Sequence, residues 1–196
     1  MKINQEAAEL RKLLFVVTED WAFLSHRFHL AKLALDNGYK VALLSKNSEH
    51  EEMLKSSGIK VINWSINRGS INPLREIYTL WQVFLAVRSF SPDLVHAVAW
   101  KPVLYSALAC KLAGIKSQVF ALGGLGFIFS SKKKFAKILR PLIVVTFRFV
   151  FQGQKSRLIL QNSDDLNKLW KLNMIEKERT VLIRGSGVDT NVFFPL

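Results

Sequence analysis

The chain has one cysteine, Cys110, among its 196 residues. A single thiol cannot form an intrachain disulfide, so a disulfide-stapled fold is excluded. Cys110 lies in the apolar segment 105–113, and no other metal-ligand residue stands at a useful spacing from it. This context predicts a small buried hydrophobic side chain rather than a nucleophile or a metal ligand.

Long apolar runs are also missing. The run at 142–151 is interrupted by Arg148 and is much shorter than the roughly 20 residues that a spanning helix needs. Residues 1–10 carry two acids and lack the apolar core of a signal peptide. We therefore expect the chain to start in the cytoplasm and to have no membrane-spanning helix.

Acidic residues are scarce, with 15 Asp and Glu against 28 Lys and Arg, which gives a formal net charge of +13. Such an excess favours a polyanionic partner, for example phosphate groups, anionic lipid or nucleic acid. The cations are densest just before the apolar run, and these are the candidate membrane-facing residues: Lys132, Lys133, Lys134, Lys137 and Arg140. An amphipathic helix over 132–151 that lies at an anionic membrane surface and a core helix with a basic start both fit this pattern.

The dinucleotide-binding pattern Gly-x-Gly-x-x-Gly is absent after the first apolar run, so NAD and FAD are not expected. The sequence also shows no metal-ligand constellation and no Ser-His-Asp order. We expect no cofactor and no metal.

Seven short apolar segments alternate with helix-like segments along the chain. Because parallel neighbours need crossover connections, this order predicts an α/β fold, a single domain with a doubly wound, mostly parallel Rossmann-like sheet. The predicted strands are 12–18, 39–44, 58–63, 94–97, 118–121, 157–160 and 181–183. The predicted helices are 25–38 with Ser25 as N-cap and Gly38 as C-cap glycine, 48–56, 73–90, 102–113, 132–151 and 163–172.

Ligands of such sheets bind beyond the carboxyl ends of the strands, so the loops there supply the candidate site residues. Acids that follow the first strand could accept hydrogen bonds from sugar hydroxyls or act as a base, and histidine could donate or accept a proton. Arginine forks and glycine amides suit phosphate. The candidate catalytic residues are Glu19, Asp20 and His96. The candidate substrate-binding residues are Ser25, His26, Arg68, Lys101, Gly123, Gly124, Gly126 and Arg184. Each of them, taken alone, is also compatible with a capping or solvated role.

Three segments resemble the N-terminal domain of the retaining group one, or family four, glycosyltransferases of the GT-B fold. They are 15–27 followed by 37–41, then 92–96 with 101–109 and 121–129, and finally 161–165 with 183–195. The resemblance implies that residues 1–196 form the acceptor-side domain and end at the interdomain hinge, with the C-terminal nucleotide-sugar domain absent.

The same resemblance implies a function and its partners. The domain is expected to bind a polyprenyl-diphosphate-linked saccharide, to meet a nucleotide sugar only with a donor domain, and to be inactive alone. A separate subunit could supply that donor domain.

No pair of glutamates has the spacing of the family's donor motif, and Glu19-Asp20-Trp21 stands where many relatives have paired glycines. We expect a peripheral location at the inner face of the plasma membrane. A lipid-binding module without catalysis is the alternative, and no nucleic-acid recognition motif is present.

Overall fold

The computed structural model describes residues 11–46, 49–125, 129, 134–151 and 155–185. Its seven strands form one sheet in the order β3-β2-β1-β4-β5-β6-β7, and every neighbouring pair is parallel. The strands are β1 (Lys12–Glu19), β2 (Lys40–Lys46), β3 (Lys60–Asn63), β4 (Leu94–Val98), β5 (Ser117–Leu122), β6 (Lys155–Leu160) and β7 (Thr180–Leu182). The predicted doubly wound α/β fold is confirmed, and each strand overlaps its predicted segment.

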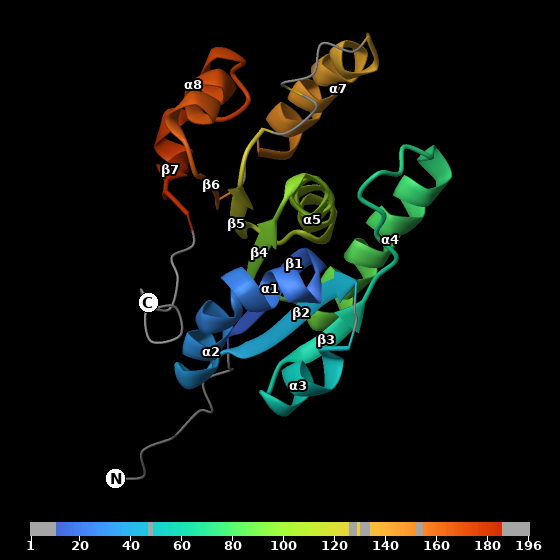
Figure 1. Ribbon diagram of the computed structural model, residues 1–196, viewed down its shortest axis with the longest axis vertical. Coiled ribbons are helices and arrows are strands. Elements are labelled where there is room, and N and C mark those ends of the chain that lie inside the picture. Colours follow the sequence, from blue (N-terminus) through green and yellow to red (C-terminus); the bar gives the residue numbers. More distant parts are fainter. Residues whose placement is uncertain (1–10, 47–48, 126–128, 130–133, 152–154, 186–196) are drawn as a thin grey trace, which may run out of the picture.

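Helices cover both faces of the sheet (Figure 1). Alternate side chains of β1 point to opposite faces, which explains why nearly the whole strand is apolar. Leu14 and Val16 belong to the core under α4 (Pro73–Phe90), α5 (Trp100–Ala113) and α7 (Lys134–Phe151). Phe15 and Val17 belong to a second core, which is covered by the helices α1 (Asp20–His26), α2 (Phe28–Asp36) and α3 (Glu51–Ser56).

The remaining helices are α8 (Ser163–Lys171), which connects β6 to β7, and a 3-10 turn, η1 (Lys177–Arg179). Local signals fix several helix ends. Asn72 caps α4 by accepting hydrogen bonds from the backbone of Leu74 and Arg75, and Pro73 occupies the first turn. Asn162 caps α8 in the same way, by accepting from Asp165 N.

The predicted helix over 25–38 is wrong in one respect that matters for the site. The chain forms two helices there, α1 and α2, and they are separated at Arg27, whose φ of −135° and ψ of −10° are not helical. Ser25 is consequently not an N-cap, because it lies in the last turn of α1 and its hydroxyl donates to Trp21 O. Gly38 follows the end of α2 with a φ of 79°, as the predicted C-cap glycine requires.

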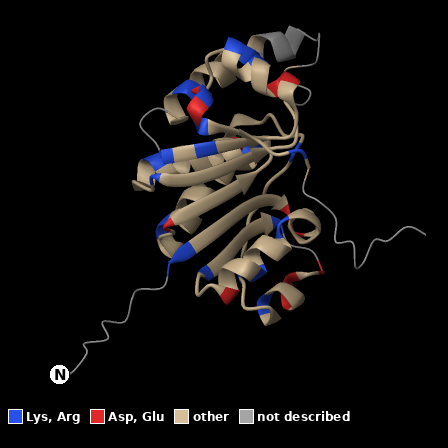
Figure 2. Ribbon diagram, turned by 90° about the vertical axis from the view of Figure 1, so that its left-hand side faces the viewer, with Lys and Arg blue, Asp and Glu red and all other residues tan. Residues whose placement is uncertain are grey.

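Charged residues are unevenly distributed in sign. Figure 2 shows Lys and Arg on helices, strands and connections throughout the molecule, whereas Asp and Glu are fewer. No helix among the described residues combines the length and the apolarity that crossing a membrane demands.

Candidate functional site

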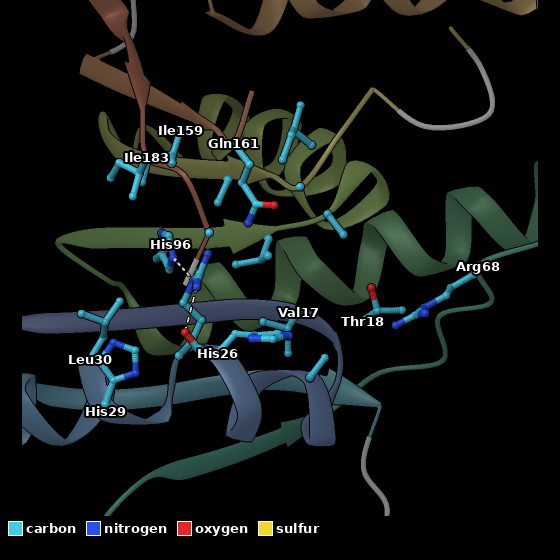
Figure 3. Close-up of a pocket in the computed structure, with 18 residues that line it drawn as sticks. Val17, Thr18, His26, His29, Leu30, Arg68, His96, Ile159, Gln161 and Ile183 are labelled. Carbon is cyan, nitrogen blue, oxygen red and sulfur yellow. Dashed lines mark hydrogen bonds between the residues drawn. The ribbon is translucent and has the colours of Figure 1, made fainter. Parts of the chain in front are cut away.

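A cleft of about 710 Å³ opens at the carboxyl edge of the sheet. Its walls come from the ends of β1, β4, β5 and β6, from α1 and α2, and from the segment after β7. Figure 3 shows Ile159, Gln161 and Ile183 on one side of the cleft and His26, His29 and Leu30 on the other. The charged and titratable residues of the lining are His26, Arg27, His29, Arg68 and His96, and no Asp or Glu is among the described residues that line it. The described lining therefore carries two arginine charges and no carboxylate.

His96 lies on β4 at the base of this cleft and is only 7% exposed. Its Nδ1 is 3.0 Å from Val119 O, and its Nε2 accepts a hydrogen bond of 3.1 Å from Arg27 Nε. Because Nε2 is the acceptor, Nδ1 carries the proton and donates to the carbonyl. Burial and then the nearby Arg27 charge lower the pKa of His96 from 6.5 to about 4, although the hydrogen bond to Val119 O acts in the opposite direction. The ring is thus neutral at physiological pH.

The break between α1 and α2 brings Arg27 to His96. In a continuous helix, the direction of the Arg27 side chain would follow the helical repeat. The backbone of Arg27 is not helical, and its side chain lines the cleft. Its guanidinium donates to His96 Nε2 and to His26 O. Burial lowers the pKa of Arg27, yet an arginine remains charged in proteins. His96 therefore acts as the residue that orients a fixed positive charge, and its predicted catalytic role stays a prediction.

Arg68 supplies a second guanidinium from the loop between β3 and α4. It forms an ion pair of 2.7 Å with Glu19 and lies over the Trp21 ring. The Trp21 indole donates to the same Glu19 carboxylate. The end of β1, the first turn of α1 and the loop after β3 are thereby joined beside the cleft by the Glu19 carboxylate, the Trp21 indole and the Arg68 guanidinium.

Several predicted residues lie outside the cleft lining. Glu19 faces Arg68, and Asp20 is completely buried in the first turn of α1, where it accepts from Trp21 N. Ser25 is exposed on α1. The structure therefore does not bring the two candidate acids into contact with the cleft, because β1 extends one residue beyond the predicted strand and α1 begins at once.

Lys101 is held elsewhere. Its ammonium donates to the carbonyls of Asn67 and Ser70 and to both oxygens of Glu76, at distances between 2.7 and 2.9 Å. Glu76 also accepts from the Tyr105 hydroxyl. Lys101 is thus bound to the backbone on either side of Arg68 and fixes the loop that carries this arginine.

The glycine segment after β5 is anchored at the edge of the cleft. Gly123 lines the cleft, and Gly124 O accepts a hydrogen bond of 2.9 Å from the Trp100 indole. Asp165, at the start of α8, accepts from Leu125 N, so the segment is tied to the next helix. Gly126 lies outside the described residues. Arg184 is exposed, while its neighbours Ile183 and Gly185 line the cleft.

Ala99 also lines the cleft, and it was not among the residues predicted from the sequence. Its φ of 81° and ψ of 162° belong to a region that residues with a Cβ rarely adopt. Ala99 N donates to Ala121 O, and Ala99 O accepts from Val103 N, so both neighbouring elements hold it there. Backbone strain at the carboxyl end of β4 marks this position as one fixed by the surrounding structure.

The candidate membrane-facing helix has two apolar faces. Ile143, Phe147 and Val150 of α7 are buried in the core, whereas Ile138, Leu142, Val145 and Phe149 are exposed. The buried face agrees with the predicted core helix, and the predicted contact of the other face with a membrane stays a prediction. Of the five candidate cations, Lys132 and Lys133 lie outside the described residues, Lys134 and Lys137 begin the helix, and Arg140 is half-buried.

In the described part of the chain, no group of three or more His, Cys, Asp or Glu side chains is arranged to hold a metal ion. Cys110 is buried, and burial raises the pKa of its thiol to about 12. The prediction of a packing role for this cysteine agrees with its position in the core.

One curated protein is similar to this chain in sequence. A protein from Campylobacter jejuni subsp. jejuni serotype O:2 is 24% identical over 183 residues, which are 89% of this chain and 48% of that protein. It is named N,N'-diacetylbacillosaminyl-diphospho-undecaprenol alpha-1,3-N-acetylgalactosaminyltransferase. The chain thus spans about half the length of this curated relative.

Solved structures agree on the fold. MurG from Acinetobacter baumannii superposes with a TM-score of 0.58 at 13% identity over 93% of this chain and 47% of its own. Anabaena HepE, solved in complex with UDP and glucose, gives a TM-score of 0.58 at 16% identity over 93% of this chain and 46% of its own. At these identities the likeness establishes the Rossmann-like fold found in GT-B glycosyltransferases. The profile of the family described as "Glycosyl transferase 4-like" matches residues 12–163, and the chain belongs to that family.

Proposed function

We propose that this chain is the acceptor-binding half of a glycosyltransferase and that its cleft holds the diphosphate and the first sugar of a polyprenyl-linked saccharide. The donor, a nucleotide sugar, would be bound by a second domain outside residues 1–196, in the same protein or in a partner subunit. The observation that carries this proposal is the cleft itself, which combines Arg27 and Arg68 with no acidic side chain among its described lining residues.

The arrangement of these arginines suits a diphosphate. Guanidinium forks match phosphate oxygens, and Arg27 is oriented before any ligand arrives because His96 accepts from its Nε. Arg68 could exchange its partner Glu19 for a phosphate oxygen at little cost, since that ion pair is partly exposed. Gly123 and the nearby imidazoles of His26 and His29 would then face the sugar.

The contribution of such a half-site is positioning. A transferase must hold the acceptor hydroxyl against the anomeric carbon of the donor, and correct orientation can account for a large part of the barrier reduction. This chain would fix the acceptor from its diphosphate end. The second domain would stabilise the donor diphosphate as it leaves.

The acceptor's lipid would keep the protein at the membrane. The exposed line of Ile138, Leu142, Val145 and Phe149 on α7, together with the lysines at the start of this helix, has the character of an interfacial helix. The named substrate of the Campylobacter relative, a diphospho-undecaprenol saccharide, supports the same setting. We propose a peripheral position at the cytoplasmic face of an anionic membrane.

Calorimetry with a short-chain polyprenyl-diphosphate sugar in detergent tests the acceptor proposal. Arg27→Gln and Arg68→Gln should each weaken binding by about 10-fold to 100-fold, because a charge-assisted hydrogen bond is worth about 1.5–3 kcal/mol. Arg11→Gln serves as the matched control, since Arg11 precedes β1 at the other edge of the sheet. Equal affinity in all three variants would refute the site.

The alternative is a lipid-binding module without acceptor recognition. In calorimetry, such a module would not distinguish a polyprenyl-diphosphate sugar from the corresponding lipid alcohol, although it would bind anionic vesicles. The exposed line on α7 favours it only if the cleft variants have no effect.

A further inference from the structure

A second helix presents an exposed apolar line, and the sequence did not indicate it. On α4, the outward side chains of Leu74, Tyr78, Trp81 and Leu85 follow one another at helical spacing. Leu74 is 78% exposed, and Trp81 is 53% exposed. The opposite side of α4, with Val83 and Val87, is buried in the core. These outward side chains, together with Ile77, are called here the α4 line.

The α4 line lies on the same face of the sheet as the exposed line of α7. Both helices belong to the core on that face, and α5 packs between them (Figure 1). On α7, the outward residues Ile138, Leu142, Val145 and Phe149 have the same spacing along the helix. The two lines therefore belong to the two helices that flank α5 on this face of the sheet.

The charge around the two lines has one sign. The only acid of α4 is Glu76, whose carboxylate faces inward and is occupied by Lys101 and Tyr105. The other charged residues of α4 are Arg75 and Arg88, both exposed. The sequence has no Asp or Glu at positions 94–163, a stretch that includes α5 and α7. Exposed apolar and aromatic side chains bordered by cations are the composition that suits an anionic lipid surface.

Aromatic residues add a second chemical argument. Trp and Tyr favour the boundary between lipid chains and water, because each has an apolar ring with a polar tip. Tyr78 and Trp81 lie next to each other in the α4 line, and Trp81 stacks on Phe84 with ring centroids 5.3 Å apart. An ordinary solvent-facing helix carries charged side chains on this side instead.

We propose that the α4 line is a second membrane-contacting element and that α4 and α7 together form one docking surface for an anionic bilayer. This inference rests on the proposed membrane position of α7 and goes beyond it. A single interfacial helix leaves a domain free to roll about the helix axis, whereas two helices on either side of α5 fix its rotation. The cleft at the carboxyl edge is then held at a constant orientation to the lipid headgroups, as a lipid-linked ligand requires.

Cosedimentation of the full chain with vesicles of phosphatidylglycerol and phosphatidylcholine tests this surface. The variant Leu74→Gln/Leu85→Gln should lower the partition coefficient by about tenfold or more, because it removes two exposed leucines from the apolar contact. Leu33→Gln is the matched control, since Leu33 is an exposed leucine on α2, on the other face of the sheet. Leu142→Gln/Val145→Gln reports on α7 separately.

The outcomes separate the inference from the proposed function. If the α7 variant loses binding while the α4 variant binds as the wild type does, the inference fails and the α7 contact stands. If the wild type does not bind anionic vesicles, both membrane proposals fail, while calorimetry of the cleft remains an independent test of the acceptor site. If the α4 variant instead converts a dimer to a monomer in light scattering and keeps its vesicle affinity, a second copy covers the α4 line, and the inference is overturned.

A fluorescent label gives a direct readout of contact. Leu85→Cys can be labelled selectively with an environment-sensitive dye, because Cys110 is buried and its thiol pKa is raised to about 12. The emission should shift to the blue when anionic vesicles are added, whereas the same dye at Leu33→Cys should not respond. A shift at both positions or at neither would contradict a docking surface made by α4 and α7.

Discussion

The burial of His96 predicts that this one side chain makes the fold sensitive to mild acid. In the folded chain the pKa of His96 is lowered from 6.5 to about 4, because burial and the Arg27 charge disfavour the imidazolium. In the unfolded chain the ring titrates near 6.5. Between these two values the unfolded state binds a proton that the folded state does not, so the free energy of unfolding falls as the pH falls.

The size of this effect follows from the shift. Its contribution is fully present above pH 6.5 and is lost progressively on the way to pH 4, where the loss reaches about 3 kcal/mol. His96→Gln removes the titration while keeping one acceptor for Arg27 and one donor for Val119 O. The variant should be less stable at neutral pH and should lose less stability on acidification.

Urea unfolding at several pH values between 7.5 and 4 measures the difference. Acidic residues titrate in both proteins, so the comparison of the two curves isolates the histidine. His29→Gln, which changes an exposed histidine of α2, is the control. The reasoning is refuted if the wild type and His96→Gln lose the same free energy of unfolding over this range.

Three further predictions concern the surroundings of the cleft. Ala99→Gly should raise the thermal midpoint of unfolding, since the relief of a strained φ, about 1–3 kcal/mol, exceeds the entropic cost of glycine, about 0.5–1 kcal/mol; a lowered midpoint would contradict the strain. Lys101→Met should lower the free energy of unfolding by about 1–3 kcal/mol in chemical denaturation, because Glu76 and two backbone carbonyls lose the ammonium as a donor. Lys55→Met breaks an exposed pair with Glu51 and should cost less than about 1 kcal/mol. Glu19→Gln should increase the affinity for a polyprenyl-diphosphate sugar several-fold in calorimetry by releasing Arg68 from its ion pair, and a decrease would instead point to a direct role of Glu19 with the ligand.

The sheet could be predicted because its signals are local. Strands buried on both faces are continuous apolar runs, as at 13–17, and Pro73 and Gly38 mark helix ends with residues whose backbone preferences are strong. The parallel order followed from the alternation of strands and helices. The fold could therefore be predicted from the apolar runs, the residues at helix ends and the alternation of strands and helices.

The site was less accessible, because it depends on backbone geometry that has no signature in the residue types. Neither glycine nor proline marks the break at Arg27, yet this break decides which side chain meets His96. The same holds for Ala99, whose φ would favour glycine, and for Lys101, whose partners come from a loop about thirty residues earlier in the chain. The segments that line the cleft at the carboxyl edge could be identified from the sequence, but the direction of each side chain could not.

Photo-crosslinking tests the central claim most directly. A polyprenyl-diphosphate sugar with a diazirine on the sugar is irradiated with the full chain, and the modified peptides are identified by mass spectrometry. The account predicts crosslinks in the cleft segments around His26, His29 and Gly123, with a loss of yield in Arg27→Gln and none in Arg11→Gln. Crosslinks confined to elements away from the carboxyl edge, such as α3, or yields indifferent to Arg27, would contradict it.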